Sequence, residues 1–282
     1  MLDYRMETFL TLCDQMNYRK TAEVLQMTQP AVTQHIQYLE QYYGQKLFDY
    51  TARRLQKTTA GELLEQYGRT AQYNQMAIME KLQAPQRKRL RLGATKTIGD
   101  YVIGDMMARL LSRHDVEVSL LVDNTKHLLE KLRHTDLDIV LLEGYFDKTA
   151  YDYQLMRQEE LVGICHKDHP FAGQIVDMEA LGQETILLRE EGSGTRAVFE
   201  QLLLSHNYTL QTFAKTAFIS SFEVIKQLVR SRQGIAFVYQ SVANSHPELA
   251  TFQTTLGQVS HEFNYVYLKD THGEDVVALL EK

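Results

Sequence analysis

The stretch TQPAVTQHIQYLE, residues 28–40, predicts a helix with one apolar face and one polar face. Thr28 suits the N-cap of this helix, and Pro30 suits its first turn, where an N–H would lack a helical partner anyway. The apolar residues recur at helical spacing and are expected to be buried: Val32, Ile36 and Leu39. The opposite arc is rich in amides and hydroxyls and almost free of charge: Gln29, Pro30, Thr33, Gln34 and Gln37.

Two shorter amphipathic helices are predicted before this stretch. Their apolar residues also recur at helical spacing: Met6, Phe9, Leu10 and Cys13 in the first, and Tyr18, Ala22 and Leu25 in the second, with Asn17 as its N-cap. The three helices form a bundle whose last helix turns its polar face outward. Because glutamine and threonine can hydrogen-bond base edges in the major groove, this face predicts sequence recognition of DNA. The alternative is the solvated surface of an ordinary three-helix bundle.

A short basic hairpin is predicted after the bundle. LF at residues 47–48 indicates a strand, and RRLQK at residues 53–57 indicates its partner across a turn. Only Asp49 opposes the basic residues of this stretch. A basic wing beside a helix in the groove is placed to contact phosphates. We therefore expect the DNA backbone to be bound by Arg53, Arg54 and Lys57.

Residues 1–61 resemble the winged helix-turn-helix of the LysR-type transcriptional regulators. The resemblance rests on Ala22, Leu25, residues 28–40, Gly44, LF at 47–48 and the pattern T-x-A-G at 58–61. It implies that Gln34 and His35, at variable positions of the family, set the target sequence. Tyr50 stands where the family usually has an arginine, and this removes one phosphate contact. Lys57 stands where an apolar residue is usual and offers compensation for that loss.

A long helix is predicted after the hairpin. Thr59 and Glu62 fit a capping box at its start, and no proline interrupts the chain before Pro85. A seam with a period near 3.5 runs along this helix: Leu64, Tyr67, Ala71, Asn74 and Ile78. The resemblance implies pairing with the same helix of a second chain, and the alternative is packing on its own domain. A polar, basic hinge, QAPQRKRL at residues 83–90, marks the main domain boundary.

From residue 90 onward, short apolar strands alternate with amphipathic helices. Strands are expected at 90–94, 116–122, 137–142, 185–188, 214–219 and 235–238, with helices between them. This order predicts parallel sheets with helices on their faces. The two halves resemble the periplasmic-binding-protein-like effector domain of the same regulators, with a cleft between two lobes. Arg232 stands where that family usually has a helix-terminating glycine, so the local turn departs from the family pattern.

The carboxyl ends of the strands are the expected ligand site, because ligands bind there in open α/β sheets. The loops at 94–97, 192–195 and 220–221 carry hydroxyls and N–H groups that suit a small anion. The resemblance implies effector contacts in the first two of these loops, and residues 143–145 follow another strand. The alternative for each hydroxyl is simple helix capping. The candidate effector-binding residues are Thr95, Lys96, Thr97, Glu143, Tyr145, Ser193, Gly194, Thr195, Ser220 and Ser221.

Composition and charge narrow the class of protein. The 282 residues are 44% hydrophobic and 23% charged, which is typical of globular proteins with two or three domains. Residues 1–88 hold 11 Lys and Arg against 9 Asp and Glu, whereas the remainder holds 19 against 27. A slightly basic head therefore precedes an acidic body. We expect no membrane span, no signal peptide and a cytoplasmic protein with free thiols at Cys13 and Cys165.

No catalytic, cofactor or metal site is predicted. Gly-Ser-Gly at residues 192–194 lacks the spacing of a nucleophile elbow and of a Walker loop. CHKDH at residues 165–169 crowds three possible metal ligands together, but no second cluster accompanies them. A surface turn is the favoured interpretation of that segment.

The sequence thus predicts an α/β protein. It comprises a winged helix-turn-helix at 1–58, a linker helix and hinge at 59–88, and an effector domain at 89–282. Lobe I is expected at about 89–162 and 265–282, and lobe II at about 163–264. The expected function is a transcription regulator that binds double-stranded promoter DNA as a homodimer or homotetramer and senses a small anion. The alternative is a cytosolic solute-binding module or enzyme whose N-terminal bundle serves assembly only.

Overall fold

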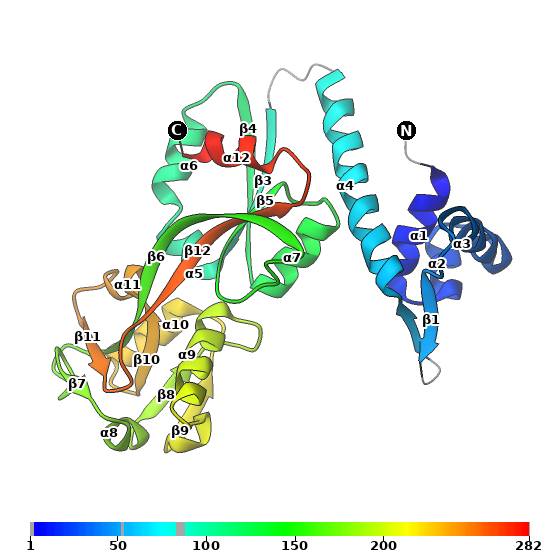
Figure 1. Cartoon of the computed structure of the whole chain (residues 1–282). Helices are drawn as coiled ribbons and strands as arrows, with labels where there is room; N and C mark the ends of the chain where they lie inside the picture. Colours follow the sequence, from blue (N-terminus) through cyan, green and yellow to red (C-terminus); the bar gives the residue numbers. More distant parts are fainter. Residues whose placement is uncertain (1–2, 52–53, 83–87, 282) are drawn as a thin grey trace. The chain divides into compact units, whose positions relative to one another are not determined.

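The computed structural model of the chain describes residues 3–51, 54–82 and 88–281. The chain divides into two compact units, which we call the head, essentially residues 1–86, and the body, essentially residues 87–282. Among the described residues, the head contains four helices and a two-stranded hairpin, and the remaining elements belong to the body (Figure 1).

The helical bundle of the head is formed by α1 (Tyr4–Gln15), α2 (Tyr18–Val24) and α3 (Gln29–Tyr43). Both predicted N-caps are confirmed. The side chains of Asn17 and Thr28 each accept a hydrogen bond from the backbone N–H three residues further on, at 3.0 and 3.4 Å. Gly44 ends α3 with a left-handed φ of 65°, a conformation that glycine adopts without a steric penalty.

The apolar stripe predicted for α3 is confirmed, because Val32, Ile36 and Leu39 are buried. Ile36 and Leu39 pack with Phe9 of α1 and with Leu47 in the core of the head. Burial of side chains of this size contributes about 1.5–3 kcal/mol each. This stripe therefore fixes which face of α3 is turned outward.

A hairpin and a long helix complete the head. Strand β1 (Phe48–Thr51) pairs antiparallel with β2 (Arg54–Lys57), and α4 (Thr59–Leu82) follows. The predicted capping box is wrong by one residue, because the hydroxyl of Thr58 accepts the hydrogen bond from the N–H of Gly61 at 3.0 Å. Neither α4 nor any other described helix combines the length and apolar character needed to cross a membrane.

The predicted seam of α4 is only partly on its surface. Leu64 is buried in the core of the head, so it packs on its own domain rather than facing a second chain. Tyr67 and Ile78 are exposed. A pairing surface on α4 would therefore include these two residues and exclude Leu64.

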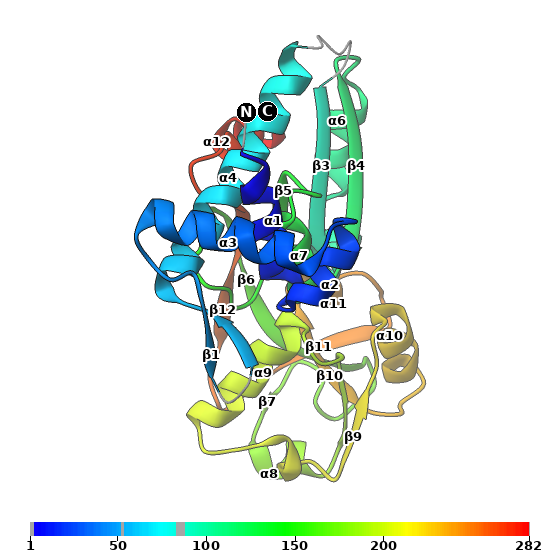
Figure 2. The ribbon, with the colours of Figure 1, turned by 90° about the vertical axis from the view of Figure 1, so that its right-hand side faces the viewer.

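The body is built on a mixed sheet with the strand order β4-β3-β5-β12-β6-β10-β8-β9. The first lobe holds the parallel strands β3 (Lys88–Thr95), β4 (Val116–Asp123) and β5 (Ile139–Glu143), with α5 (Lys96–Tyr101), α6 (Gly104–Leu111), α7 (Thr125–Arg133) and α12 (Gly273–Leu280). Figure 2 shows β3 and β4 side by side. The predicted β-α-β order and its parallel pairing are thereby confirmed for this lobe.

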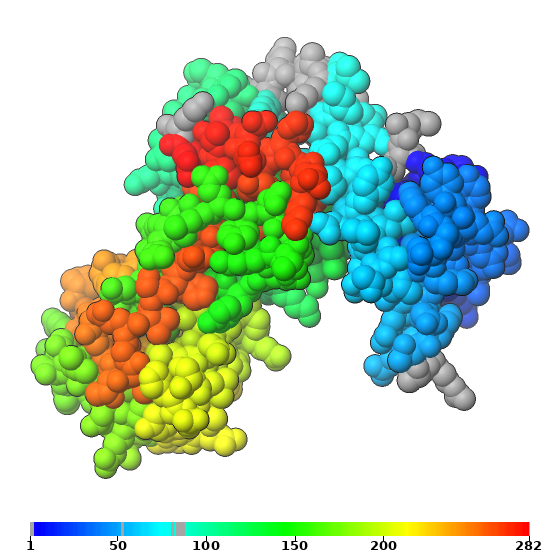
Figure 3. Space-filling model, in the orientation of Figure 1, coloured from blue at the N-terminus to red at the C-terminus, as the bar shows by residue number. Residues whose placement is uncertain are grey.

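The second lobe repeats the pattern with the parallel strands β8 (Thr185–Leu188), β9 (Lys215–Phe218) and β10 (Ile235–Tyr239). Its helices are α8 (Met178–Gly182), α9 (Gly194–Ser205), α10 (Phe222–Arg230) and α11 (Gln240–Ala243), with a 3-10 turn at Leu210–Thr212. Strands β7 (Ile175–Val176) and β11 (Leu249–Thr254) flank the sheet. Residues of this lobe form the yellow and orange end of the body in Figure 3.

Two long antiparallel strands, which the sequence did not predict, join the lobes. Strand β6 (Tyr151–His166) pairs with β12 (Val259–Leu268) over most of its length. Strand β12 also pairs with β5 of the first lobe, whereas β6 pairs with β10 of the second. The lobe boundaries expected at 162/163 and 264/265 thus fall inside continuous strands, so the two lobes share one sheet.

Arg232 lies in the turn that follows α10. It adopts a left-handed φ of 58°, the conformation for which the family usually supplies a glycine. This conformation costs a non-glycine residue about 1–2 kcal/mol. The turn is therefore retained, and the ion pair between Arg232 and Asp168 at 2.8 Å accompanies it.

Candidate functional site

The polar face of α3 is a surface of the head. Gln29, Pro30, Gln34 and Gln37 are exposed, whereas Thr33 is half-buried and donates its hydroxyl to the carbonyl of Gln29 at 3.1 Å. The glutamine side chains of this face lie outside the buried stripe of α3 and are exposed, so a partner can reach their amide groups. Exposed glutamines on a rigid helix have the chemistry that base-edge recognition requires.

His35 does not belong to this face. Its Nδ1 lies 2.8 Å from the hydroxyl of Thr8, and its ring meets the edge of the Tyr4 ring. The structure thus directs His35 toward α1, and the expectation that it sets the target sequence is corrected. Gln34 keeps its exposed position.

Not every basic side chain predicted to contact phosphates from the hairpin is available to do so. Arg54 is exposed at the start of β2, while Arg53 lies outside the described residues. Lys57 is half-buried, and its ammonium group hydrogen-bonds the carboxylate of Glu65 on α4. Lys57 therefore neutralises an internal carboxylate, and this corrects the expectation that it replaces the missing arginine on a phosphate.

A buried ion network continues from Lys57 into the bundle. The guanidinium of Arg69, on α4, pairs with Asp14 of α1 and with Glu65, and it also donates to the carbonyl of Leu10 at 3.4 Å. Burial opposes the charged form of Glu65, but the hydrogen bond from Lys57 and the charges of Lys57 and Arg69 hold its pKa below the usual value. The network ties α4 to α1.

In the body, four predicted site residues meet where the two lobes come into contact. Thr95 and Thr97 donate their hydroxyls to the two carboxylate oxygens of Glu143, the second of them at 2.9 Å. The hydroxyl of Thr195, from the second lobe, lies 3.5 Å from that of Thr97. All four side chains are buried. Burial raises the pKa of Glu143, although the hydrogen bonds from the two threonines oppose this effect.

Lys96 bridges the two lobes beside this cluster. Its ammonium donates to the carbonyl of Ser220 at 2.9 Å and lies 3.5 Å from the carboxylate of Glu190. Tyr101 makes a second bridge by donating its hydroxyl to Glu223 at 3.0 Å. The loops that the sequence selected after different strands therefore lie together in the structure.

Two glycines allow the backbones of the lobes to approach each other closely. A Cβ atom placed on Gly194 would lie 2.5 Å from the carbonyl oxygen of Glu143, and one on Gly144 would lie 2.9 Å from the Cα of Gly194. Such distances leave no room for a side chain. The two glycines thus fix how tightly β5 and α9 meet.

The substitution Gly194→Ala is expected to destabilise the body by about 1–3 kcal/mol, because the new methyl group would overlap a backbone oxygen that cannot move alone. Thermal unfolding, with hydrogen exchange followed in β5 and α9, measures the loss. Gly104→Ala is the matched control, since a Cβ on Gly104 meets no atom within 4 Å. Equal stability of the two variants would contradict this account.

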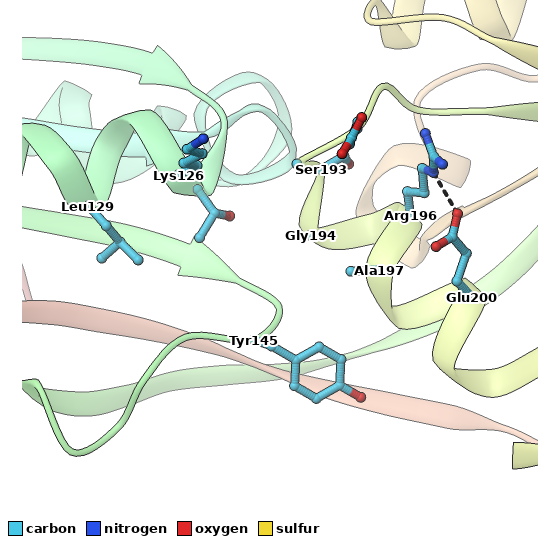
Figure 4. Close-up of a pocket in the computed structure, with 11 residues that line it drawn as sticks. Lys126, Leu129, Tyr145, Ser193, Gly194, Arg196, Ala197 and Glu200 are labelled. Carbon is cyan, nitrogen blue, oxygen red and sulfur yellow. Dashed lines mark hydrogen bonds and ion pairs between the residues drawn. The ribbon is translucent and has the colours of Figure 1, made fainter. Parts of the chain in front are cut away.

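An outer cavity of about 450 Å³ lies next to the buried cluster, between α7 of the first lobe and α9 of the second (Figure 4). Figure 4 shows Lys126 and Leu129 on one side of it and Ser193, Gly194 and Arg196 on the other. The lining residues are Thr125, Lys126, Leu129, Tyr145, Glu191, Gly192, Ser193, Gly194, Arg196, Ala197 and Glu200. Arg196 pairs with Glu200 at 2.6 Å, whereas Lys126 is exposed.

Two helix N-termini contribute polar groups to this cavity. Thr125 and Lys126 begin α7, and Ser193 is the N-cap residue before Gly194, the first residue of α9. The hydroxyl of Thr125 is buried and has no hydrogen-bond partner among the described residues. The side chain of Ser193 makes no capping hydrogen bond. Since helix N-termini carry free N–H groups and about half a positive charge, the cavity suits a small polar or anionic ligand.

The structure separates the predicted effector residues into three groups. Thr95, Thr97, Glu143 and Thr195 form the buried cluster; Tyr145, Ser193 and Gly194 line the outer cavity; Lys96 and Ser220 form the bridge. Ser221 accepts a hydrogen bond from the N–H of Val224 at 3.4 Å. Ser221 is thus the N-cap of α10, in agreement with the alternative that its hydroxyl only caps a helix.

Sequence reasoning missed the α7 side of the cavity. Thr125 and Lys126 follow the carboxyl end of β4, and ligands bind at the carboxyl ends of strands in open α/β sheets. Applying the rule to β4 as well would have found both residues. Arg196, which also lines the cavity, lies one residue beyond the predicted loop at 192–195.

Comparisons with known proteins place both units in one family. Residues 4–62 match the model of the bacterial regulatory helix-turn-helix protein, lysR family, and residues 83–281 match the model of the LysR substrate binding domain. CysL of Bacillus subtilis (strain 168), an HTH-type transcriptional regulator, is 24% identical over 288 residues, which cover 98% of this chain and 95% of CysL. CbbR of Rhizobium meliloti (strain 1021), also an HTH-type transcriptional regulator, is 31% identical over 239 residues, covering 83% and 75%.

A solved structure is similar to the body. The regulatory domain of CcmR from Synechocystis PCC6803, in complex with 2-PG, has a TM-score of 0.61 and 24% sequence identity, over 68% of this chain and 95% of the CcmR domain. This likeness supports the two-lobed α/β fold. Because the two family models together span nearly the whole chain, the protein belongs to the LysR family of DNA-binding transcription regulators with an effector-binding domain.

Proposed function

We propose that this regulator binds promoter DNA with the outer face of α3 and is controlled by a small anion in the outer cavity of the body. The observation that carries the first part is the exposed row of glutamines on α3, held outward by a buried apolar stripe. Exposed Arg54 on the hairpin supplies a phosphate contact beside it.

The second part rests on the chemistry of the outer cavity. The two helix N-termini and the ammonium of Lys126 favour negative charge, and the hydroxyl of Thr125 has no hydrogen-bond partner in the described part of the chain. Glu191 and Glu200 balance part of that charge, so a small ligand with one compact anionic group fits best. The 2-PG complex of the CcmR regulatory domain supports a ligand of this size.

A ligand in this cavity would contact both lobes at once. It would meet α7 of the first lobe and α9 of the second, and would stabilise the arrangement in which these helices are closest. Such a change in lobe geometry would alter how subunits are placed on DNA. Tyr67 and Ile78, exposed on α4, offer a surface for a homodimer, which we propose assembles into a homotetramer. Since its target is promoter DNA, we propose that the protein works in the cytoplasm.

A gel shift with DNA from the regulator's own promoter region tests the DNA-binding part. Specific retention is expected at physiological salt, where nonspecific binding is weak. If no fragment were retained at any salt concentration, the proposal would fail, and a solute-binding module or enzyme would be the remaining candidate.

Replacing Lys126 with methionine is expected to weaken anion binding about ten- to hundredfold, because it removes a charge-assisted contact worth about 1.5–3 kcal/mol. Calorimetry with sulfate, phosphate, small carboxylates and 2-PG measures the effect. Lys131→Met is the matched control, since Lys131 lies on the same helix, pairs with Asp136 at 2.9 Å and does not line the cavity. If both variants lost the same amount of anion affinity, the proposal that the anion binds in the outer cavity would be wrong.

A further inference from the structure

Three threonine hydroxyls lie where the two lobes come into contact, beside a carboxyl group of the protein itself. Glu143 ends β5 and places its carboxylate between Thr95 and Thr97, each of which donates one hydrogen bond to it. Thr195 closes the same space from the second lobe, 3.5 Å from Thr97. We call these three threonine hydroxyls the inner cradle.

Hydrogen-bond accounting shows what the inner cradle can still bind. A threonine hydroxyl has one proton to donate and two lone pairs to accept with. Thr95 and Thr97 give their protons to Glu143, so toward any other group they present lone pairs only. A second anion would meet these lone pairs and the carboxylate itself. The side chain of Glu143 also fills the space between the two threonines, and the inner cradle is therefore closed to anions.

The backbone separates the inner cradle from the outer cavity. Gly194 lies against the carbonyl of Glu143 and also lines the outer cavity, whereas Thr95, Thr97 and Glu143 do not line it. A ligand in the outer cavity thus meets Ser193, Gly194 and Tyr145 without reaching the inner hydroxyls.

We propose that Glu143 is a tethered ligand, whose carboxylate fills the inner cradle in place of an anionic group from solution. This inference rests on the proposed function only in assigning the effector to the outer cavity. It adds a specificity rule: the effector binds through one anionic group in the outer cavity, and molecules with a second anionic group that must reach the inner cradle are rejected.

Chemical rescue of Glu143→Ala tests this role in the full-length protein. Removing the carboxylate leaves a vacant cradle of hydroxyl donors, which formate is small enough to enter. We expect sodium formate to raise the melting temperature of Glu143→Ala by several degrees in a saturable manner, beyond the effect of sodium chloride at equal ionic strength. If the variant does not fold alone, formate and not chloride is expected to restore its near-ultraviolet circular dichroism.

Glu143→Gln is the matched control, because glutamine has the same shape and keeps the cradle filled. The wild type and Glu143→Gln are expected to respond to formate no more than to chloride. A wild-type response equal to that of Glu143→Ala would overturn the proposal, since the cradle would then accept an anion beside Glu143. The absence of any formate-specific effect on Glu143→Ala would also overturn it. Neither outcome depends on Lys126 or on DNA binding, so a failure here is distinct from a failure of the proposed function.

Discussion

Replacing Arg69 with methionine is expected to lower the free energy of unfolding of the head by about 3–5 kcal/mol, the usual cost of removing one partner from a buried ion network. Arg69 is buried and pairs with both Asp14 and Glu65. Without it, Asp14 and the carbonyl of Leu10 lose a partner, and Glu65 keeps its ion pair with Lys57 but loses the one with Arg69. A loss of this size is a large part of the stability of a small domain.

Hydrogen exchange in α1 during urea titration measures this loss within the full chain, because the network links α1 to α4. The control is Arg19→Met, which removes an exposed pair with Glu23 at 3.1 Å. A pair of this kind contributes at most about 0.5 kcal/mol. Equal protection of α1 in both variants would show that the network contributes nothing beyond a surface pair.

The same network predicts the direction of the pH dependence. The pKa of Glu65 is held below its ordinary value of 4.5 in the folded head, so the pairing stabilises the fold fully above that pH. The stabilisation is lost as the pH falls below 4.5 toward the lower pKa of the folded state. In Arg69→Met this acid-dependent part is expected to shrink, because one of the charges that lower the pKa is missing.

Local patterns in the sequence were sufficient to predict most of the elements. The stripe of α3 follows from helical periodicity, and the caps Asn17 and Thr28 follow from side-chain chemistry within three residues. The error at Thr58 and Thr59 arose because two adjacent threonines have the same capping chemistry, and only the backbone decides between them.

Partners that are distant in the sequence could not be predicted. The sequence places Lys57 in a basic hairpin, but the packing of that hairpin on α4 brings its ammonium to Glu65. Glu143 was selected as a site residue because it ends a strand, yet only the fold shows that its carboxylate consumes the hydroxyls of Thr95 and Thr97. Side-chain direction at a strand end depends on contacts with both lobes.

The long strand β6 was missed for a different physical reason. Its burial changes along its length, from largely exposed residues at Tyr151–Glu160 to six consecutive buried residues ending at His166. Neither part shows the alternation that identifies a strand with one buried face. The strand passes from one lobe to the next, and each part is buried according to its own surroundings.

The double substitution Gln34→Ala, Gln37→Ala is expected to abolish most sequence-specific DNA binding while leaving the fold intact. Both side chains are exposed on α3 and outside its buried stripe. Each base contact contributes about 1–3 kcal/mol of discrimination, which corresponds to a loss of about five- to hundredfold per glutamine. Gel shifts with specific and scrambled fragments measure the loss. The control is Gln201→Ala, an exposed glutamine on α9 of the body.

The salt dependence of the same gel shifts separates base contacts from phosphate contacts. The glutamine variants are expected to keep the wild-type dependence of affinity on salt, because amides release no counterions. When the logarithm of the affinity is plotted against the logarithm of the salt concentration, Arg54→Ala is expected to reduce the steepness of the line by about one unit. Lys57→Met is expected to leave it unchanged, because Lys57 is paired with Glu65. A weaker salt dependence of DNA binding in Lys57→Met would show that Lys57 does contact a phosphate. If the glutamine variants retained the specific fragment as well as the wild type does, the proposal that α3 recognises bases would be wrong. Removing an amide that contacts a base must lower the affinity.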